Sequence, residues 1–128
     1  MELEEMLAYT DRLHNEKNIR ELKRFLNELN PADIAQLLES IANEKKRMFL
    51  FRMLTKENAA ETFVEFDGDT QESLIRSFSD SELKEVLDEL YIDDAADIVE
   101  EMPASVVKRI LKNTDSEMRE AINSILKY

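Results

Sequence analysis

Signals for the start of a helix recur along this chain at intervals too short for long helices. Candidate starts after the first two helices lie 10 to 14 residues apart, at positions 30, 43, 55, 69, 79, 91, 102 and 114. Most are Asn, Asp, Ser or Thr, whose side chains accept a hydrogen bond from the first turn of a helix. Each interval holds about two and a half helical turns and a tight turn. The spacing therefore predicts a long series of short helices.

Apolar residues recur within these intervals at the spacing of one helix face. The pattern 0, 3, 4, 7 is met by Ile34, Leu37, Leu38 and Ile41, by Leu83, Val86, Leu87 and Leu90, and by Ala95, Ile98, Val99 and Met102. Helices this short are marginal alone, so each must bury its apolar stripe on its neighbours. We predict an all-α fold, a right-handed superhelix (α-solenoid) of about ten short helices.

The domain organisation follows from the same pattern. We expect residues 1–17 to form a separate amphipathic helix and its connection, and residues 18–128 to form the short-helix superhelix. No internal linker is long enough to divide the chain, so residues 1–128 are predicted to be a single domain. Asp67-Gly68 is the one glycine-containing turn and is expected to mark a corner.

The net charge excludes several kinds of partner. The chain has 29 acidic and 17 basic residues, a formal charge of −12, which repels phosphate backbones and anionic lipid headgroups and concentrates cations. Nucleic-acid binding is not expected. The longest strongly apolar run, Met48–Phe51, is far too short to cross a bilayer, so we expect no membrane insertion by these residues. The absence of cysteine favours a reducing compartment.

Catalytic and transition-metal chemistry are not expected. The single histidine, His14, is predicted to be a surface residue, and neither a nucleophile elbow nor a glycine-rich phosphate loop is present. Zinc and iron sites need imidazole or thiolate ligands that this chain lacks. Carboxylates remain, and they suit Mg²⁺, Ca²⁺ or Mn²⁺.

The best carboxylate candidates lie in the segment Ile92–Val99. Asp93 and Asp97 are four residues apart, so they are neighbours on one helix face. Mg²⁺ is commonly held by one or two carboxylates and several waters. The alternative is that these acids offset the positive end of the helix dipole. A helix starting after Tyr91 needs only Asp94 for that purpose, and the two interpretations stay open on spacing alone.

Several segments together resemble the N-terminal intracellular domain of MgtE-type magnesium transporters. They are Pro31–Leu38, Ala59-Ala60-Glu61, Leu90–Asp97 and the closing Ser124–Tyr128, in matching order and spacing. The resemblance implies a superhelical domain followed by CBS domains and a transmembrane Mg²⁺ pore in a homodimer, with those domains lying beyond residue 128. It also implies that Mg²⁺ binds weakly between this domain and the CBS domains, through Asp93, Asp97 and Glu61.

The function implied by the resemblance is regulatory. We expect a domain at the cytoplasmic face of the membrane that senses Mg²⁺ and stabilises the closed state of the transporter. The alternative is a free-standing helical-repeat adaptor, similar to flagellar motor switch proteins of the FliG type. Under that alternative, the acidic pair serves only the start of its helix.

Overall fold

The computed structural model describes residues 1–126, and within that stretch it contains ten α-helices and no strand. The all-α prediction of about ten short helices is therefore confirmed. None of the helices in this stretch has the length and apolar character needed to cross a membrane. The helices are α1 (Leu3–Asn15), α2 (Ile19–Glu28), α3 (Pro31–Glu39), α4 (Glu44–Phe51), α5 (Lys56–Glu65), α6 (Gly68–Ser77), α7 (Asp80–Asp88), α8 (Ile92–Glu100), α9 (Ala104–Lys112) and α10 (Ser116–Leu126).

The chain divides into two compact units. The first unit is Met1–Phe66, with helices α1 to α5, and the second is Asp67–Tyr128, with helices α6 to α10. The superhelical winding of the whole chain and its organisation as a single domain stay predictions.

Six consecutive helices, α2 to α7, begin with a side chain that accepts a hydrogen bond from the backbone N–H three residues later. These capping residues are Asn18, Asn30, Asn43, Thr55, Asp67 and Ser79. Ser79 and Glu82 form a reciprocal capping box, with bonds of 3.1 and 3.0 Å between side chain and backbone. Caps satisfy backbone donors that a short helix otherwise leaves open. The predicted starts at 30, 43, 55 and 79 are confirmed.

Three of the predicted starts are wrong by one or two residues. The start predicted at 102 lies one residue later, because Pro103 is the N-cap residue of α9. Helix α6 is capped by Asp67, whose Oδ1 accepts the Thr70 N–H at 2.8 Å, so Gly68 is its first residue and Asp69 lies in its first turn. Helix α10 is preceded by Asp115, whose Oδ1 accepts the Met118 N–H at 2.7 Å. The predicted cap of α10, Thr114, is buried. At the starts of α6 and α10, a second hydrogen-bond acceptor one or two residues away competes for the capping position.

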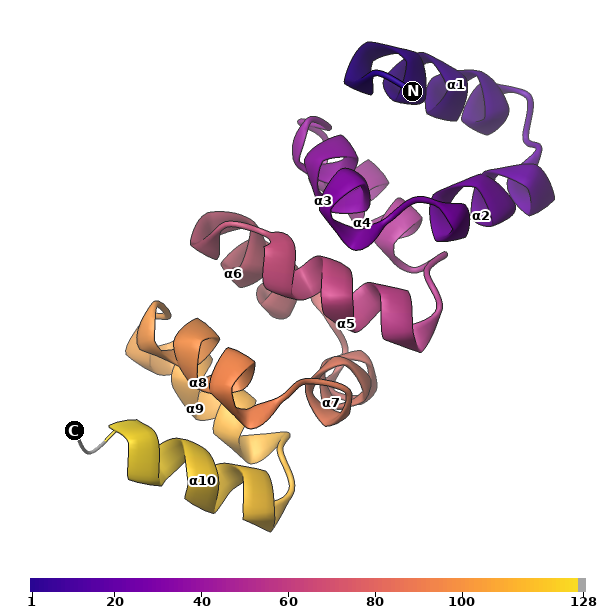
Figure 1. Ribbon diagram of the computed structural model, residues 1–128. Coiled ribbons are helices and arrows are strands. Elements are labelled where there is room, and N and C mark those ends of the chain that lie inside the picture. Colours follow the sequence, from indigo (N-terminus) through magenta and orange to yellow (C-terminus); the bar gives the residue numbers. More distant parts are fainter. Residues whose placement is uncertain (127–128) are drawn as a thin grey trace. The chain divides into compact units, whose positions relative to one another are not determined.

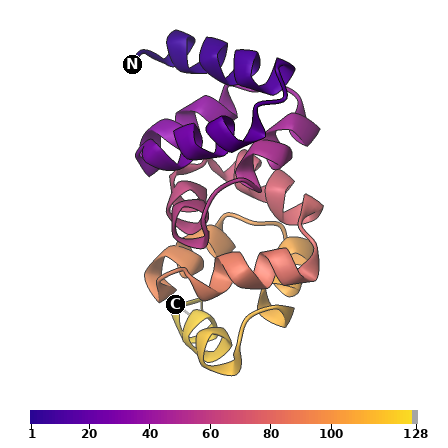
Figure 2. The same ribbon diagram turned by 90° about the vertical axis from the view of Figure 1, so that its right-hand side faces the viewer.

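The first unit is built around α3, which packs against α1, α4 and α5 (Figures 1 and 2). Three phenylalanines form an aromatic cluster in its core. The ring centroids lie 6.5 Å apart for Phe51 and Phe63, 6.1 Å for Phe51 and Phe66, and 6.3 Å for Phe63 and Phe66. Close aromatic packing of this kind stabilises a core beyond the area that it buries.

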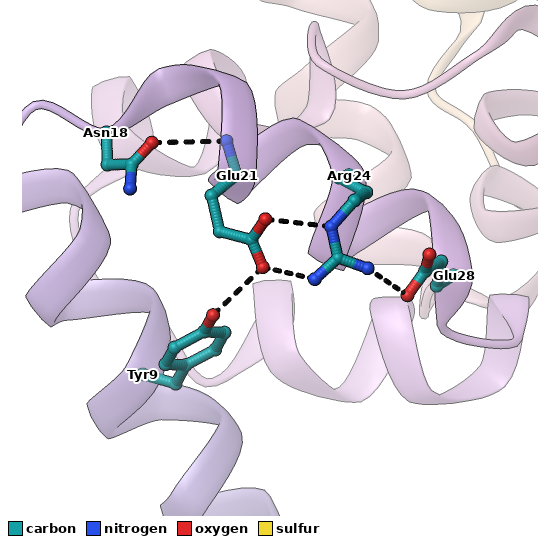
Figure 3. A network of polar contacts seen from close by, with 5 residues as sticks. All are labelled: Tyr9, Asn18, Glu21, Arg24 and Glu28. Atoms are coloured by element: carbon teal, nitrogen blue, oxygen red, sulfur yellow. Dashed lines mark hydrogen bonds and ion pairs between the residues drawn. The ribbon is translucent and has the colours of Figure 1, made fainter.

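A network of polar contacts joins α1 to α2 on the surface of the first unit (Figure 3). The Tyr9 hydroxyl donates to Glu21 at 3.0 Å, and the Arg24 guanidinium donates to Glu21 and to Glu28. The hydrogen bond from Arg24, and to a smaller extent that from Tyr9, holds the pKa of Glu21 below its ordinary value. The bond to Glu21 in turn raises the pKa of Tyr9. Glu21 and Glu28 are thus both neutralised by Arg24 within this network.

The sequence predicts that His14 is a surface residue, and in the structure its side chain is half-buried. Its ring meets that of Phe49 edge-on, with centroids 5.6 Å apart. Phe49 is 39% exposed, and its neighbours Met48, Leu50 and Phe51 are buried. This one aromatic residue of α4 therefore covers the histidine and does not enter the core.

The second unit packs α8 against α10 and α6 against α9. The most deeply buried large side chains come from four of its helices and are Leu74, Ile75, Leu83, Ile110 and Ile122. Arg109 of α9 fixes the end of α6, because its guanidinium donates to the carbonyls of Ile75 and Phe78. A second contact joins it to the Asp80 carboxylate at 3.1 Å.

Candidate functional site

Helix α8 separates a buried apolar face from an acidic one. Ala95, Ala96, Ile98 and Val99 are buried, and α8 packs against α10. Asp93 and Asp97 are both exposed on the other side of the helix. The helical spacing of four residues places their Cβ atoms about 5–6 Å apart. The structure thus confirms that the two acids are neighbours on one solvent-exposed face.

Neither carboxylate is neutralised by a neighbour. Among the described residues, the side chains of Asp93 and Asp97 make no ion pair and no hydrogen bond. The sequence explains why, since the stretch 85–107 holds eight acids and neither lysine nor arginine. On the N-terminal side of this stretch, Lys84 is engaged with Asp88 at 3.2 Å. Two adjacent anionic groups therefore face solvent without a cation from residues 1–126.

The start of α8 differs from those of α2 to α7. Tyr91 is the N-cap residue, as predicted, and its side chain accepts no capping hydrogen bond. Asp93 and Asp94 lie in the first turn, where negative charge favours the helix dipole. Asp97 lies beyond that turn, where the dipole effect has faded. Helix-start chemistry therefore accounts for Asp93 and Asp94 and leaves Asp97 unexplained.

Glu61 belongs to the first unit, on helix α5. It is exposed, and Glu57 and Glu65 lie one turn before and one turn after it on the same face. The opposite side of α5, including Ala60 and Phe63, is buried. The structure describes the two units separately, so it brings Asp93 and Asp97 together but does not join Glu61 to them.

The donor set fits a partial Mg²⁺ site. Residues 1–126 contain no group of three or more acidic, histidine or cysteine side chains that could hold a metal ion. Two free, adjacent carboxylates still match the one or two that Mg²⁺ commonly takes from a protein while keeping several waters. When bound, the ion supplies positive charge between anionic groups. Asp93, Asp97 and Glu61 stay predicted ligands.

Sequence reasoning missed two apolar neighbours of the acidic pair. Tyr91 is 81% exposed and Ile92 is 39% exposed, directly before Asp93. The signal was present in the sequence, because an aromatic residue stands where six preceding helices have a polar cap. A tyrosine in that position gives the helix no acceptor.

The profile of the family described as "MgtE intracellular N domain" matches residues 29–128. The chain belongs to this family. The match covers α3 to α10 and includes Glu61, Asp93 and Asp97. The resemblance found in the sequence is therefore confirmed, and the three predicted ligands are residues of an MgtE N domain.

Two solved structures share the fold of this MgtE N domain. One is described as the cytosolic domain of the Mg²⁺ channel MgtE in complex with ATP, with a TM-score of 0.82 and 24% identity over 95% of this chain. The other is described as the soluble part of a magnesium transporter, with a TM-score of 0.83 and 23% identity over 99% of this chain. The chain spans 50% of the length of each. No curated protein matches it.

Proposed function

We propose that this MgtE N domain is a regulatory part of a magnesium transporter. In this proposal it senses Mg²⁺ at the cytoplasmic face of the membrane through Asp93, Asp97 and Glu61, at an interface with CBS domains of the same polypeptide in a homodimer. Its compact arrangement stabilises the closed state. The observation that carries the proposal is the family match over residues 29–128, which includes an exposed, unneutralised pair of acids.

The physical basis is charge repulsion that a cation can remove. The domain carries a formal charge of −12, and residues 85–107 contribute eight acids without a base. A second acidic surface is therefore repelled when these carboxylates are bare. Once the carboxylates are neutralised by a shared ion, the two surfaces can approach. In this proposal the bound ion holds the two acidic surfaces together and thereby stabilises the docked arrangement.

The size of the response depends on the difference in ion affinity between the two arrangements. A tenfold preference for the docked arrangement at one ion site contributes about 1.4 kcal/mol. Several weak sites together therefore shift the equilibrium more steeply than one. Glu61 adds a second group of carboxylates to the pair on α8. Weak binding by the isolated domain is expected, because it holds only part of each site.

The alternative function is that of a free-standing adaptor, and the Mg²⁺ titration distinguishes it from the proposal. In that role, Asp93 and Asp97 would serve the helix start alone and Mg²⁺ would bind diffusely. The proposal assigns no catalytic role to the domain in either case.

The test is a Mg²⁺ titration of the 128-residue chain followed by amide NMR shifts at constant ionic strength. We expect weak, saturable shifts centred on α8 around Asp93 and Asp97, with a smaller group around Glu61. Small shifts spread evenly over the acidic surface would contradict the proposal.

The chain offers a matched control pair in Glu85 and Glu89. They are also four residues apart, exposed and in the second unit. The double variant Asp93→Asn with Asp97→Asn should abolish the shifts on α8. The double variant Glu85→Gln with Glu89→Gln changes the charge equally and should leave them in place. Equal losses in the two variants would show that only net charge matters.

A further inference from the structure

The N-terminal end of α8 exposes two large apolar side chains beside the acidic pair. Tyr91 is 81% exposed and Ile92 is 39% exposed. Tyr91 is the most exposed large hydrophobic residue in the described part of the chain. Single exposed apolar residues are ordinary on a protein surface. Here two of them are consecutive and are joined to Asp93 by the chain.

Tyr91 also occupies a position at which another residue would stabilise the domain. Its backbone angles, φ −73° and ψ 150°, match those of the capping residue Asn30, −74° and 156°. A capping side chain there typically favours folding about fivefold. The chain thus omits a cap and leaves an aromatic ring in solvent at the same position. Local departures of this kind mark residues that serve a function other than folding.

The surroundings of Tyr91 define the chemistry of what covers it. Residues 85–107 hold eight acids and no base, and six of these acids lie within six residues of Tyr91. These six are Glu85, Asp88, Glu89, Asp93, Asp94 and Asp97. A protein surface that buries the ring therefore has to come with positive charge, either its own or that of bound divalent ions.

We propose that Tyr91 and Ile92 are the apolar anchor of the Mg²⁺-dependent interface, inserting into an apolar recess of the partner domain of the same polypeptide. This rests on the proposed function. In this arrangement the ions on Asp93 and Asp97 remove the repulsion, and burial of the tyrosine ring supplies affinity. Aromatic residues buried at the centre of an interface commonly carry a large share of its binding energy. Ions alone set when the domain docks, and the anchor sets how tightly.

The test is limited proteolysis of the full-length transporter across a range of Mg²⁺ concentrations. Wild-type protein should become protected as Mg²⁺ rises. The Tyr91→Ala variant should show a docked-to-undocked ratio about tenfold lower at a fixed Mg²⁺ concentration, with the Mg²⁺ dependence retained. Equal protection of Tyr91→Ala and wild type would overturn the anchor.

The variant Tyr91→Asn separates docking from folding. It supplies the missing cap, so the thermal midpoint of the isolated 128-residue chain should rise by about 4 °C. The same variant should dock as poorly as Tyr91→Ala. A gain in stability without a loss of protection would show that the ring is not buried by a partner.

A matched pair of isoleucines gives the control. Ile19 is the first residue of α2 and 42% exposed, and Ile92 is the first residue of α8 and 39% exposed. Ile92→Ala should weaken protection several-fold, whereas Ile19→Ala should not. If wild-type protein shows no Mg²⁺-dependent protection, the proposed function itself fails. A different result is that Mg²⁺ weakens docking and that Tyr91→Ala weakens it further. That result would indicate a basic partner surface and would overturn the ion-dependent anchor.

Discussion

The two units of this domain have similar lengths and very different charge. Residues 1–66 carry 13 acids and 10 bases, a formal charge of −3, and residues 67–128 carry 16 acids and 7 bases, a formal charge of −9. In the first unit some acids form ion pairs within their own helix, as Glu21 and Glu28 do with Arg24. In the second, the bases flank a long acidic stretch without entering it. The difference predicts that the larger part of any response to cations originates in the second unit, with Glu61 of the first unit contributing less.

Arg109 of the second unit has a structural role, and its removal gives the largest predicted effect on stability. Arg109→Ala leaves the carbonyls of Ile75 and Phe78 without their charged donor, and we expect a loss of about 3 kcal/mol of stability. Arg24→Ala in the first unit removes only exposed pairs and should cost much less stability. Urea unfolding of the two variants measures both values. Equal losses of stability in the two variants would contradict this difference between the two units.

The first unit contains buried hydroxyls without a hydrogen-bond partner, and none is found in the described part of the second. Thr10 and Thr62 are fully buried, and their hydroxyls have no hydrogen-bond partner among residues 1–126. Thr62→Val keeps the shape and removes the unsatisfied group, so we expect a gain of about 1 kcal/mol. Thermal unfolding checks this. A loss of stability would mean that the hydroxyl is satisfied, for instance by a buried water.

Removing the repulsion between Asp93 and Asp97 in the second unit gives a smaller predicted effect on stability. Asp97→Asn removes a like-charge neighbour of Asp93 and should stabilise the domain by about 0.3 kcal/mol at low salt. Asp93→Asn relieves the same repulsion but loses a favourable helix-dipole interaction, so it should be near neutral. Hydrogen exchange of α8 amides at low and high NaCl measures both. A large loss in either variant would indicate a structural role for that acid.

The smallest effect is a pH dependence confined to the first unit. The pKa of Glu21 is lowered by Arg24 and Tyr9, so this carboxylate stabilises the folded state above its unfolded pKa, about 4.3. That contribution is lost as the pH falls through the folded pKa. The raised pKa of Tyr9 has the opposite sense, since its contribution is present below about pH 10 and is lost as the pH rises through its folded pKa.

A pH titration of the carboxyl carbon of Glu21 measures this shift. Replacing Arg24 by Ala should raise the midpoint of Glu21. An unchanged midpoint would show that the network of Figure 3 does not control the carboxylate.

Much of the fold follows from the sequence because caps and apolar stripes are local signals. Asn30, Asn43, Thr55 and Ser79 cap their helices as predicted. The signal fails where two acceptors compete, as at Asp67 against Asp69 and at Thr114 against Asp115. It also could not foresee that Phe49 covers His14, because that contact joins α1 to α4.

The candidate site divides in the same way. The shared exposed face of Asp93 and Asp97 is a property of one helix, so their spacing predicts it. Their lack of a neutralising partner depends on where distant bases go, and Arg109 illustrates this, because it turns to Asp80 and the end of α6. The relation of Glu61 to the pair involves two units and is beyond any local pattern.

The central claim is that the acids of α8 set the Mg²⁺ response of a transporter. Mg²⁺ flux through the reconstituted full-length protein tests it most directly, measured against the Mg²⁺ concentration on the side of this domain. We predict that wild-type flux falls as this concentration rises and that Asp93→Asn with Asp97→Asn shifts the fall to several-fold higher Mg²⁺. The control Glu85→Gln with Glu89→Gln removes the same charge from the acidic stretch but no proposed ligand, so its shift should be clearly smaller than that of the α8 variant. Identical curves for wild type and the α8 variant would contradict the claim.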